Sequence, residues 1–335
     1  MARFLVTGGC GFIGSHLVDA LLRQGHQVRV LDDLSSGRTH NLAPEAELMV
    51  GDVADPAITA LAMTGITGCF HLAAIAGVQP SLADWTGTHR VNQSGTVTVL
   101  DAARPAAVPV VYASSAAIYG DSAEPRLVET LPARPLTPYA VDKLGSELHA
   151  RVATRIHGVP TTGLRFFNVY GPRQDPASPY AGVITTFAAN IVAGRPLDLH
   201  GGGEQQRDFV FVADAVVHMV AAMERLLERQ RDRRPAAADV FNVCTGQPTR
   251  IRDLVVLIAR LAGRQPTLRQ VAPRAGDIRR SLGDTSAAIH HLRVAATTTL
   301  DEGLRATLSR LTPDLPADTP AAPFGLHWSS RLLSH

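Results

Sequence analysis

The sequence predicts an α/β protein built on a doubly wound parallel sheet, with a second, smaller and mostly C-terminal α/β domain. Two observations predict the sheet. Short apolar runs alternate with helical patterns from residue 3 to about residue 172, and a glycine-rich turn joins the first run to the first helix. Such alternation produces right-handed crossovers and a parallel sheet whose ligands lie at the carboxyl ends of the strands. A chain of 335 residues can form one large or two medium-sized domains.

Composition disfavours several classes of protein. Hydrophobic residues make up 45% and charged residues 19% of the chain, as in globular proteins. The net charge of +2 is too small to favour a nucleic-acid partner, and the basic run 225–234 is interleaved with acids, which is typical of a solvated helix end. Cys10, Cys69 and Cys244 lie far apart, so we expect neither disulfides nor a metal site, and a cytoplasmic location. With no apolar stretch of about 18 residues, we expect no membrane span.

The first apolar run, residues 3–7, leads directly into a glycine-rich turn at residues 8–14 and then into an amphipathic pattern that begins at Ser15. Gly9, Gly11 and Gly14 fit the G-x-G-x-x-G spacing, and Gly8 adds an alternative spacing. Glycines at these places allow a tight turn and a close approach to a pyrophosphate, while the helix N-terminus offers free N–H groups. The sequence therefore predicts a Rossmann-type dinucleotide site.

The second run, residues 27–31, ends at Asp32 and Asp33. A carboxylate at this position accepts hydrogen bonds from the adenosine ribose hydroxyls and repels a 2′-phosphate, which favours NAD over NADP. Arg38 is the counter-argument, because a guanidinium there could reach a 2′-phosphate. We give the carboxylate more weight because its position is better defined.

Further strands are expected at residues 48–50, 68–72 and 108–112, with helices at 56–63 and 88–104 between them. Asp52 and Val53 follow the third strand and could bracket the adenine. His71 ends the fourth strand, where a structural role is favoured over acid–base chemistry. The small residues after it are what a backbone passing close to a cofactor needs.

The expected chemistry centres on Lys143, the only lysine in the chain. Tyr139 lies four residues before it, so a helix starting near Pro138 would place both side chains on one face. An ammonium in this geometry could lower the pKa of the phenol and hydrogen-bond a ribose hydroxyl. Ser115 follows the fifth strand and could face Tyr139 across a substrate. The alternatives are a solvated lysine and a serine-rich turn.

Later in the same helix, an apolar stripe runs through Leu144, Leu148, Val152 and Ile156. The simplest interpretation of the stripe is core, and the alternative is a dimer face. Residues 164–172 then look like a sixth strand running into a loop.

Together these motifs resemble the extended short-chain dehydrogenase/reductase family, and within it the NAD-dependent nucleotide-sugar epimerases of the UDP-glucose 4-epimerase type. The resemblance covers residues 3 to about 290 and is carried by TGGCGFIG, Asp32, Gly51-Asp52-Val53, HLAA, Val91-Asn92-x-x-Gly95-Thr96, SSAAIYG, Tyr139-x-x-x-Lys143 and LRFFNVYGPR. It implies that Ser115 and Tyr139 flank the sugar 4-hydroxyl and that Lys143 holds the nicotinamide ribose. The cofactor residues it implies are Gly8, Gly11, Phe12, Ile13, Gly14, Asp32, Asp33, Ser36, Asp52, Val53, Leu72, Ala73, Ala74, Asn92, Tyr139, Lys143 and Phe167.

The last third is expected to hold a UDP-sugar. Residues 173–206 are rich in Gly, Pro and Ser and are expected to form loop with short helices, and residues 239–243 the last strand. The resemblance implies that Arg207 and Arg274 clamp the diphosphate, that Asp277 accepts the uridine ribose hydroxyls, and that the small Ser281 leaves room for a 2-N-acetyl group. The substrate residues it implies are Ser115, Asn168, Val183, Arg207, Phe209, Arg274, Asp277 and Ser281. We expect residues 1–172 and 207–243 to form the NAD-binding domain, 173–206 and 244–311 the substrate domain, and 312–335 a tail. A homodimer is also expected.

The expected reaction is reversible 4-epimerisation of a UDP-hexose, glucose to galactose or their N-acetylamino counterparts, through a 4-keto sugar. Two departures from the family pattern bear on it. The dehydratase branch typically has Asp-Glu where Ala116-Ala117 stand, which disfavours a 4,6-dehydratase, and Ala76 replaces a lysine that some galactose epimerases use. A UDP-glucuronate 4-epimerase, another NAD-dependent nucleotide-sugar dehydrogenase or dehydratase, and a catalytically silent NAD-binding protein are the alternatives.

Overall fold

The computed structural model describes residues 1–178, 181–273 and 278–311. Its centre is a seven-stranded sheet in the order β10-β6-β5-β4-β1-β2-β3, in which every pair of neighbours is parallel. Strand order reverses between β1 and β4, which opens a crevice at the carboxyl ends of these strands. The expected Rossmann-type fold is therefore confirmed. The strands are β1 (Arg3–Thr7), β2 (Gln27–Asp32), β3 (Glu47–Val50), β4 (Gly68–His71), β5 (Val110–Ser115), β6 (Thr161–Phe166) and β10 (Ala238–Val243).

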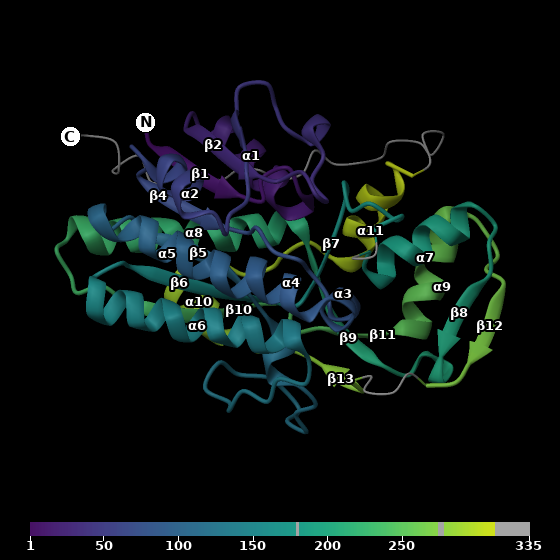
Figure 1. Ribbon diagram of the computed structural model, residues 1–335. Coiled ribbons are helices and arrows are strands. Elements are labelled where there is room, and N and C mark those ends of the chain that lie inside the picture. Colours follow the sequence, from purple (N-terminus) through teal and green to yellow (C-terminus); the bar gives the residue numbers. More distant parts are fainter. Residues whose placement is uncertain (179–180, 274–277, 312–335) are drawn as a thin grey trace.

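Helices cover both faces of the sheet (Figure 1). One face carries α2 (Pro56–Met63), α5 (Gly95–Ala103) and α6 (Pro138–His157), and the other carries α1 (Phe12–Arg23), α8 (Val212–Arg231) and α10 (Ser286–Leu292). The predicted helix at 88–104 exists as α4 (Trp85–His89), a π-helical segment (Arg90–Ser94) and α5 in continuous succession. Short 3₁₀ turns occur at Thr39–Asn41, Arg104–Ala106, Ala116–Tyr119 and Gly201–Gly203.

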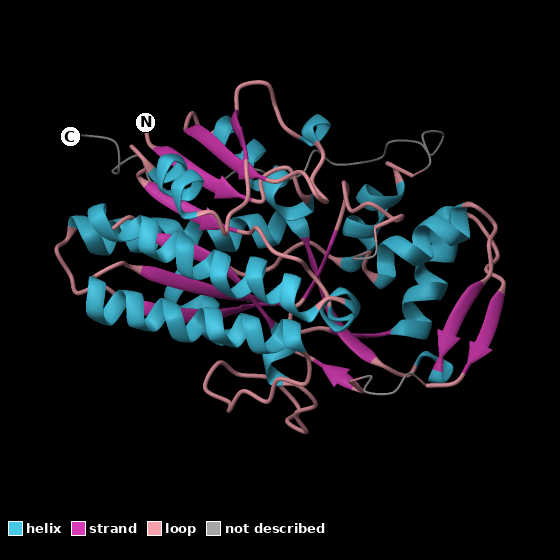
Figure 2. Cartoon of the chain, viewed as in Figure 1, coloured by secondary structure: helices cyan, strands magenta, loops and turns pink. Residues whose placement is uncertain are grey.

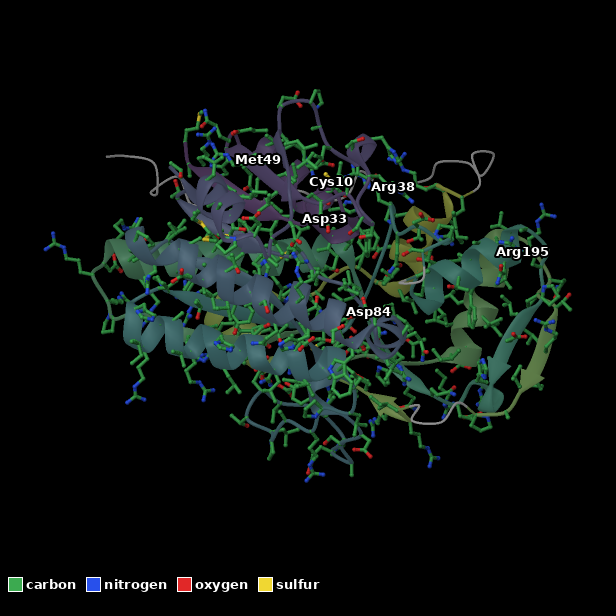
Figure 3. The ribbon with its side chains drawn as sticks, in the orientation of Figure 1. Cys10, Asp33, Arg38, Met49, Asp84 and Arg195 are labelled. Atoms are coloured by element: carbon green, nitrogen blue, oxygen red, sulfur yellow. The ribbon has the colours of Figure 1, made fainter. Side chains whose placement is uncertain are left out.

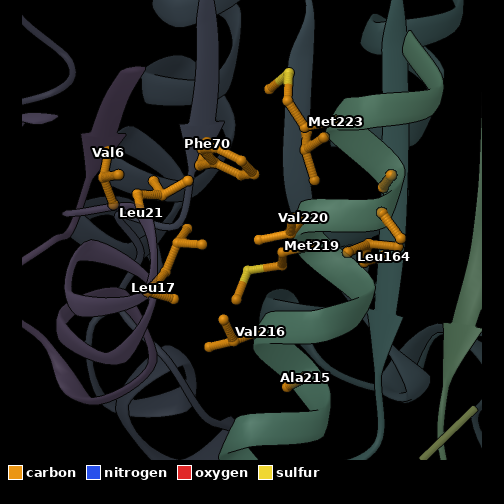
Figure 4. Close-up of a cluster of buried hydrophobic side chains, with 14 of the residues drawn as sticks. Val6, Leu17, Leu21, Phe70, Leu164, Ala215, Val216, Met219, Val220 and Met223 are labelled. Carbon is orange, nitrogen blue, oxygen red and sulfur yellow. The ribbon is translucent and has the colours of Figure 1, made fainter. Parts of the chain in front are cut away.

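Apolar side chains from α1 and α8 pack against each other and against one face of the sheet (Figure 4). The amphipathic pattern of α1 places Leu17 and Leu21 on its buried face, and both are fully buried. They belong to one cluster with side chains of α8 and of the central strands, including Val216, Met219, Val220, Met223, Val6, Phe70 and Leu164. This packing fixes the start of α1, and with it the glycine turn, against the sheet.

A smaller part of the molecule lies beyond the carboxyl ends of the strands (Figure 2). Its main sheet joins β7 (Asn168–Tyr170), β9 (Gln206–Phe211), β11 (Pro248–Arg250) and β13 (Arg280–Ser281), and a separate pair joins β8 (Leu197–His200) to β12 (Leu268–Val271). The helices α7 (Val183–Val192), α9 (Ile251–Ala262) and α11 (Leu300–Leu308) pack around a cluster of their own, and a short α3 (Val78–Ala83) precedes α4. No helix in the described part of the chain is long and apolar enough to cross a membrane.

The structure differs from the sequence expectations in four places. The segment 173–206, expected as loop with short helices, contains the ten-residue α7 and the strand β8. In the described part of the chain, three short strands follow residue 243, where the last strand was expected to end. β9 joins the small sheet although it falls in the predicted NAD-binding range, and α10 packs on α8 and β10 although it falls in the predicted substrate range.

The fourth difference concerns the apolar stripe of α6, whose interpretation as core was wrong. Leu144 packs partly against a buried cluster, but Leu148, Val152 and Ile156 are 51%, 53% and 68% exposed. The face of α6 that is buried carries small and polar residues instead, among them Lys143, Ser146, Glu147 and Ala150.

Candidate active site

The turn between β1 and α1 forms a cradle of bare backbone. Gly8 has a left-handed φ of +72°, and a Cβ there would lie 2.7 Å from the backbone nitrogen of Ala73. A Cβ on Gly14 would collide with the Gly8 carbonyl oxygen. Gly11 caps α1 without any side-chain hydrogen bond, so the first N–H groups, at Phe12 and Ile13, face the turn and not a capping side chain. This arrangement fits a pyrophosphate.

The adenosine side of the cradle is built around Asp32, which is 7% exposed. Its two carboxylate oxygens accept hydrogen bonds from the backbone nitrogens of Cys10 and Leu34, each at 2.9 Å. Each oxygen keeps a second lone pair, so the carboxylate can still accept a ribose hydroxyl. Arg38 pairs with Asp175 at 3.6 Å, which supports the choice of NAD over NADP.

The neighbouring residues are more open. Asp33 is exposed and its Oδ1 accepts hydrogen bonds from the Ser35 backbone and hydroxyl, while Ser36 is exposed. Cys10, Asp33 and Arg38 lie near one another by the carboxyl ends of β1 and β2 (Figure 3). Val53 is buried, and Asp52 accepts hydrogen bonds from the Ala54 backbone and from Arg90. These two residues therefore lie at the end of β3, where an adenine contact was predicted.

The segment after β4 passes directly over the cradle. The hydroxyl of Thr7 accepts hydrogen bonds from the backbone nitrogens of Leu72 and Ala73 at 3.2 Å. His71 is buried between the hydroxyls of Thr7, at 2.8 Å, and Thr96, at 3.1 Å, and burial lowers its pKa to about 3. The structural role expected for His71 is confirmed. The sequence reading overlooked Thr7, whose place at the end of β1 was the available signal.

Asn92 continues this support from the opposite side. Its side-chain amide accepts a hydrogen bond from the backbone nitrogen of Ile75 at 2.8 Å and donates one to the carbonyl of Ile75 at 3.0 Å. Asn92 is 1% exposed and lies in the π-helical segment, a conformation that is frequent at functional sites. It fixes the loop that includes Ala74, and the cofactor contact that the resemblance implies for Asn92 stays a prediction.

The three residues expected to do the chemistry come together at the carboxyl end of β5. Ser115 caps the 3₁₀ turn after β5, where its hydroxyl accepts a hydrogen bond from the backbone nitrogen of Ala117, and its side chain lies close enough to Tyr139, at the start of α6, to lower the pKa of the phenol. Lys143 follows one helical turn later, is 5% exposed, and donates from Nζ to the carbonyl of Ala113 at 2.9 Å. Its Nζ lies 5.8 Å from the centre of the Tyr139 ring. Thr137 caps α6 and so fixes where the helix begins, which sets the position of Tyr139 in its first turn.

Burial dominates the electrostatics of this trio. It lowers the pKa of Lys143 to about 8, and the nearby carboxylate of Asp142 acts in the opposite direction. Burial also raises the pKa of Tyr139 above its ordinary value of 10, while the hydrogen bond with Ser115 lowers it. The pKa of Tyr139 is thus raised, whereas Lys143 was expected to lower it, because burial destabilises the phenolate more than the nearby Ser115 side chain stabilises it.

The residues expected near the nicotinamide and sugar follow β6. Phe167 is 6% exposed, and its ring packs against Tyr119, with centroids 6.4 Å apart, in a small cluster with Cys244. Asn168 is exposed and opens β7, which pairs with β9 at Phe209. Phe167 and Asn168 therefore lie where the chain passes from β6 of the large sheet to β7 of the small sheet.

Three of the residues predicted to contact the substrate, Arg207, Phe209 and Ser281, lie on strands of the small sheet. Arg207 on β9 is paired in register with Ser281 on β13, and it donates to the carbonyl of Ile278 at 2.7 Å. Phe209 is 6% exposed, and Val183 begins α7 after Gly182. Arg274 and Asp277 lie outside the described residues, so their predicted roles stay predictions.

Comparison with known proteins agrees with this geometry. Residues 4–244 match the profile of the NAD dependent epimerase/dehydratase family. The chain is 38% identical over 314 residues to the UDP-glucose 4-epimerase of Mycolicibacterium smegmatis, covering 91% of this chain and 97% of the relative.

Solved structures share the fold, and two of them serve as examples. One is UDP-N-acetylglucosamine 4-epimerase from Methanobrevibacter ruminantium with UDP-N-acetylmuramic acid (TM-score 0.86, 31% identity, 92% of this chain and 97% of that chain covered). The other is UDP-glucose 4-epimerase from Thermus thermophilus with NAD (TM-score 0.83, 34% identity, 92% and 98% covered). The chain therefore belongs to the NAD-dependent epimerase/dehydratase family, a branch of the extended short-chain dehydrogenase/reductases, and its cofactor is NAD.

Proposed function

We propose that this chain is a UDP-hexose 4-epimerase, which interconverts sugars that differ only at C4 through a transient 4-keto sugar. The observation that carries the proposal is that Ser115, Tyr139 and Lys143 come together at the end of β5, with Lys143 one turn after Tyr139 on the same helix, beside a cradle for NAD. A serine, a tyrosine and a buried lysine at a strand end are suited to moving a proton on and off a hydroxyl group.

NAD supplies the hydride transfer at C4. Tyr139 takes the proton of the 4-hydroxyl, directly or through Ser115, and returns it when the hydroxyl re-forms. Lys143 holds the nicotinamide ribose and, together with the positive nicotinamide, stabilises the phenolate that burial disfavours. The nucleotide stays bound while the keto sugar turns over, which exposes its other face.

The nucleotide is proposed to bind along β9 and β13. Arg207, with Arg274 from a separate segment, would clamp the diphosphate, and Asp277 would accept the uridine ribose hydroxyls. The small side chain of Ser281 lies beside Arg207 in the sheet, which supports a pocket that also admits a 2-N-acetyl group. UDP-glucose and UDP-N-acetylglucosamine are therefore both candidate substrates.

The rival reactions are 4-epimerisation of UDP-glucuronate, net oxidation of a nucleotide sugar, and 4,6-dehydration. Dehydration is disfavoured because Ala116 and Ala117 form the turn directly after Ser115, so no carboxylate stands there. A non-catalytic role is disfavoured because Ser115 and Tyr139 stand beside Lys143, whereas a protein that only binds NAD would need Lys143 for the ribose but no proton-transfer pair.

The direct test is to incubate the NAD-loaded protein with UDP-glucose, UDP-N-acetylglucosamine and UDP-glucuronate and follow the sugars by NMR. The proposal predicts C4 epimers of at least one of the first two without accumulation of NADH. Steady formation of NADH would favour a dehydrogenase. Lack of turnover on the whole panel would revive the non-catalytic alternative.

We also propose that two copies pair through α6. Val141, Leu148, Val152 and Ile156 are each more than half exposed on one helix, and α5, which contacts α6, adds the exposed Val97. An apolar strip of this extent on otherwise mixed-charge helices favours a second copy of the same chain as its partner.

A further inference from the structure

A row of buried polar residues crosses three parallel strands directly behind the candidate site. Ser114 on β5 is in register with Arg165 on β6, and Arg165 is in register with Asn242 on β10. All three are at most 6% exposed. Residues in register on neighbouring strands point to the same face of a sheet, and here that face is the one covered by α6.

Glu147 of α6 binds two members of this row. Its Oε1 accepts hydrogen bonds from the Ser114 hydroxyl at 2.5 Å and from Arg165 Nε at 2.8 Å, and its Oε2 accepts one from Arg165 Nη2 at 2.8 Å. Glu147 lies one helical turn after Lys143, and Ser114 immediately precedes Ser115. The same carboxylate therefore ties the strand that carries the serine to the helix that carries Tyr139 and Lys143.

The row is anchored at its far end as well. Arg165 Nη1 donates to the hydroxyl of Tyr119 at 2.9 Å and to the carbonyl of Glu129 at 3.0 Å, and its guanidinium lies 4.9 Å from the centre of the Tyr119 ring. The Tyr119 hydroxyl donates to Asn242 at 2.7 Å. Tyr119 ends the 3₁₀ turn that Ser115 begins, so both ends of this turn are held.

A buried ion pair of this kind gains little stability over a well-packed apolar pair, because removing two charges from water costs about as much as their attraction returns. Its value is geometric, since a bidentate guanidinium and carboxylate fix one relative placement of strand and helix. We propose that Ser114, Glu147 and Arg165 are positioning residues that hold the Ser115 hydroxyl against Tyr139. The proposal rests on the proposed function, because it assigns these residues to the same site.

Other charges near the site must be considered in any titration. Tyr139 lies near Lys143. The residue before Lys143 is Asp142, whose carboxylate pairs with His89 of α4 at 2.8 Å. The charges of Glu147 and Arg165 also affect the pKa of Tyr112 on β5, which Glu147 raises and Arg165 lowers. Arg151 of α6 and Glu129 complete the charged surroundings of the network. Replacing Ser114 by alanine changes none of these charges, which makes it the cleanest probe.

The experiment compares two alanine variants of the NAD-loaded enzyme. Ser114→Ala removes the hydroxyl bound to Glu147. Thr154→Ala is the matched control. Thr154 lies on α6, the helix that carries Tyr139 and Glu147, and its buried hydroxyl donates to the carbonyl of Val159 at 2.7 Å, away from the site. The pKa of Tyr139 is measured by NMR with tyrosine labelled at Cζ, its signal being assigned by its absence in Tyr139→Phe.

We expect Ser114→Ala to raise the pKa of Tyr139 by about 0.5–1, because a weakened hydrogen bond from Ser115 no longer stabilises the phenolate. Turnover should fall roughly tenfold, since small displacements of catalytic groups have large effects, with KM changed less than about twofold. Thr154→Ala should lower the melting temperature without moving either quantity.

An unchanged Tyr139 pKa in Ser114→Ala would overturn the proposal, as would an equal shift in Thr154→Ala. The titration uses no sugar, so it remains interpretable if the proposed reaction is wrong. Failure of the wild-type enzyme on the UDP-sugar panel would count against the proposed function alone.

Discussion

Lys143 is the residue whose environment is least favourable on its own and most informative about function. It is 5% exposed, and burial lowers the pKa of its ammonium to about 8. Its nearest fixed partner is a carbonyl oxygen, not a carboxylate. A protein that keeps a buried cation in this setting does so for something that binds there, and the ribose of NAD has the matching hydroxyls.

The cost of burying Lys143 predicts an unusual pH dependence of stability. Below pH 8 the lysine is protonated in both the folded and unfolded states, and the folded state bears the full cost, on the order of 3 kcal/mol. Between about pH 8 and 10.5 the unfolded chain binds a proton that the folded chain does not, so the free energy of unfolding rises with pH.

Lys143→Met should therefore melt at or above the temperature of the wild type at pH 7 in the NAD-free protein, although it should lose activity. The difference should shrink as the pH rises from about 8 towards 10.5. Thermal melts across this range measure it. A Met variant that is clearly less stable at pH 7 would show that burial of the ammonium is compensated in a way the hydrogen bond to Ala113 does not explain.

Tyr139→Phe tests the proton-transfer role without removing the ring. Turnover of the UDP-sugar should fall by about 10²–10⁴-fold, the usual size of a general acid–base contribution. NAD binding should be retained, because the cradle at Gly8 to Gly14 is untouched. Kinetics together with the NAD content of the purified variant measure both effects, and a variant with normal activity would remove Tyr139 from the mechanism.

At this scale, the sequence was sufficient to predict that Ser115, Tyr139 and Lys143 come together, because a strand end and a four-residue helical spacing determine their placement. It did not predict that burial would raise the Tyr139 pKa, since burial depends on the loops above the site. The Ser114, Glu147 and Arg165 network was also not predicted, because strand register cannot be read from residues distant in the chain.

At the scale of single elements, the turn from β1 to α1 places the most specific demand on the sequence. Gly14→Ala would put a methyl group into the carbonyl of Gly8, and that contact is backbone, which cannot rotate away. We expect the affinity for NAD to fall at least tenfold while the fold is retained. The control for a general loss of helix stability is Ala20→Gly, on the same helix α1. Gly25→Ala would not serve, because Gly25 has a positive φ that an alanine would strain.

Calorimetric titration with NAD measures the effect. Equal affinities of Gly14→Ala and the wild type would contradict the close approach that the structure shows. A loss shared by Ala20→Gly would assign the effect to helix stability.

The helix α6 shows how an element can be predicted correctly while its orientation is not. Its start at Pro138 and its length follow from the cap at Thr137 and the αL glycine at residue 158. Its most hydrophobic stripe faces outward, because the inward face is occupied by the polar groups that the site requires. Hydrophobic periodicity identifies the buried face of a helix only when that face carries no polar residues required by a functional site.

At the scale of the whole molecule, the exposed stripe predicts the state of assembly. Ile156→Glu should convert a dimer into a monomer, because it places a charge on the most exposed apolar side chain of the proposed contact. Val256→Glu on α9 is the matched control, since Val256 and Ile156 are both 68% exposed. Light scattering coupled to size exclusion measures the mass, and a wild-type monomer, or a Val256→Glu variant that dissociates equally, would contradict the proposed interface.

The large sheet was predictable from the sequence because each of its strands is a short apolar run followed by a turn signal or helix. The smaller part was not, because several of its strands are short or exposed: β12 is exposed throughout, and β13 has two residues. Such strands form only because neighbouring segments, such as β9 and β8, offer hydrogen-bonding edges. Their existence therefore depends on tertiary structure and not on local pattern.

The central claim is that C4 is oxidised and reduced with its own hydrogen returned. The most direct measurement is to let the NAD-loaded enzyme epimerise its UDP-sugar in D₂O and to read the isotope at C4 by NMR. The account predicts that the C4 epimer forms and keeps protium at C4, because the hydride is held by NAD and never exchanges with solvent. Deuterium at C4 of the epimer would require removal of a proton from carbon and would contradict it.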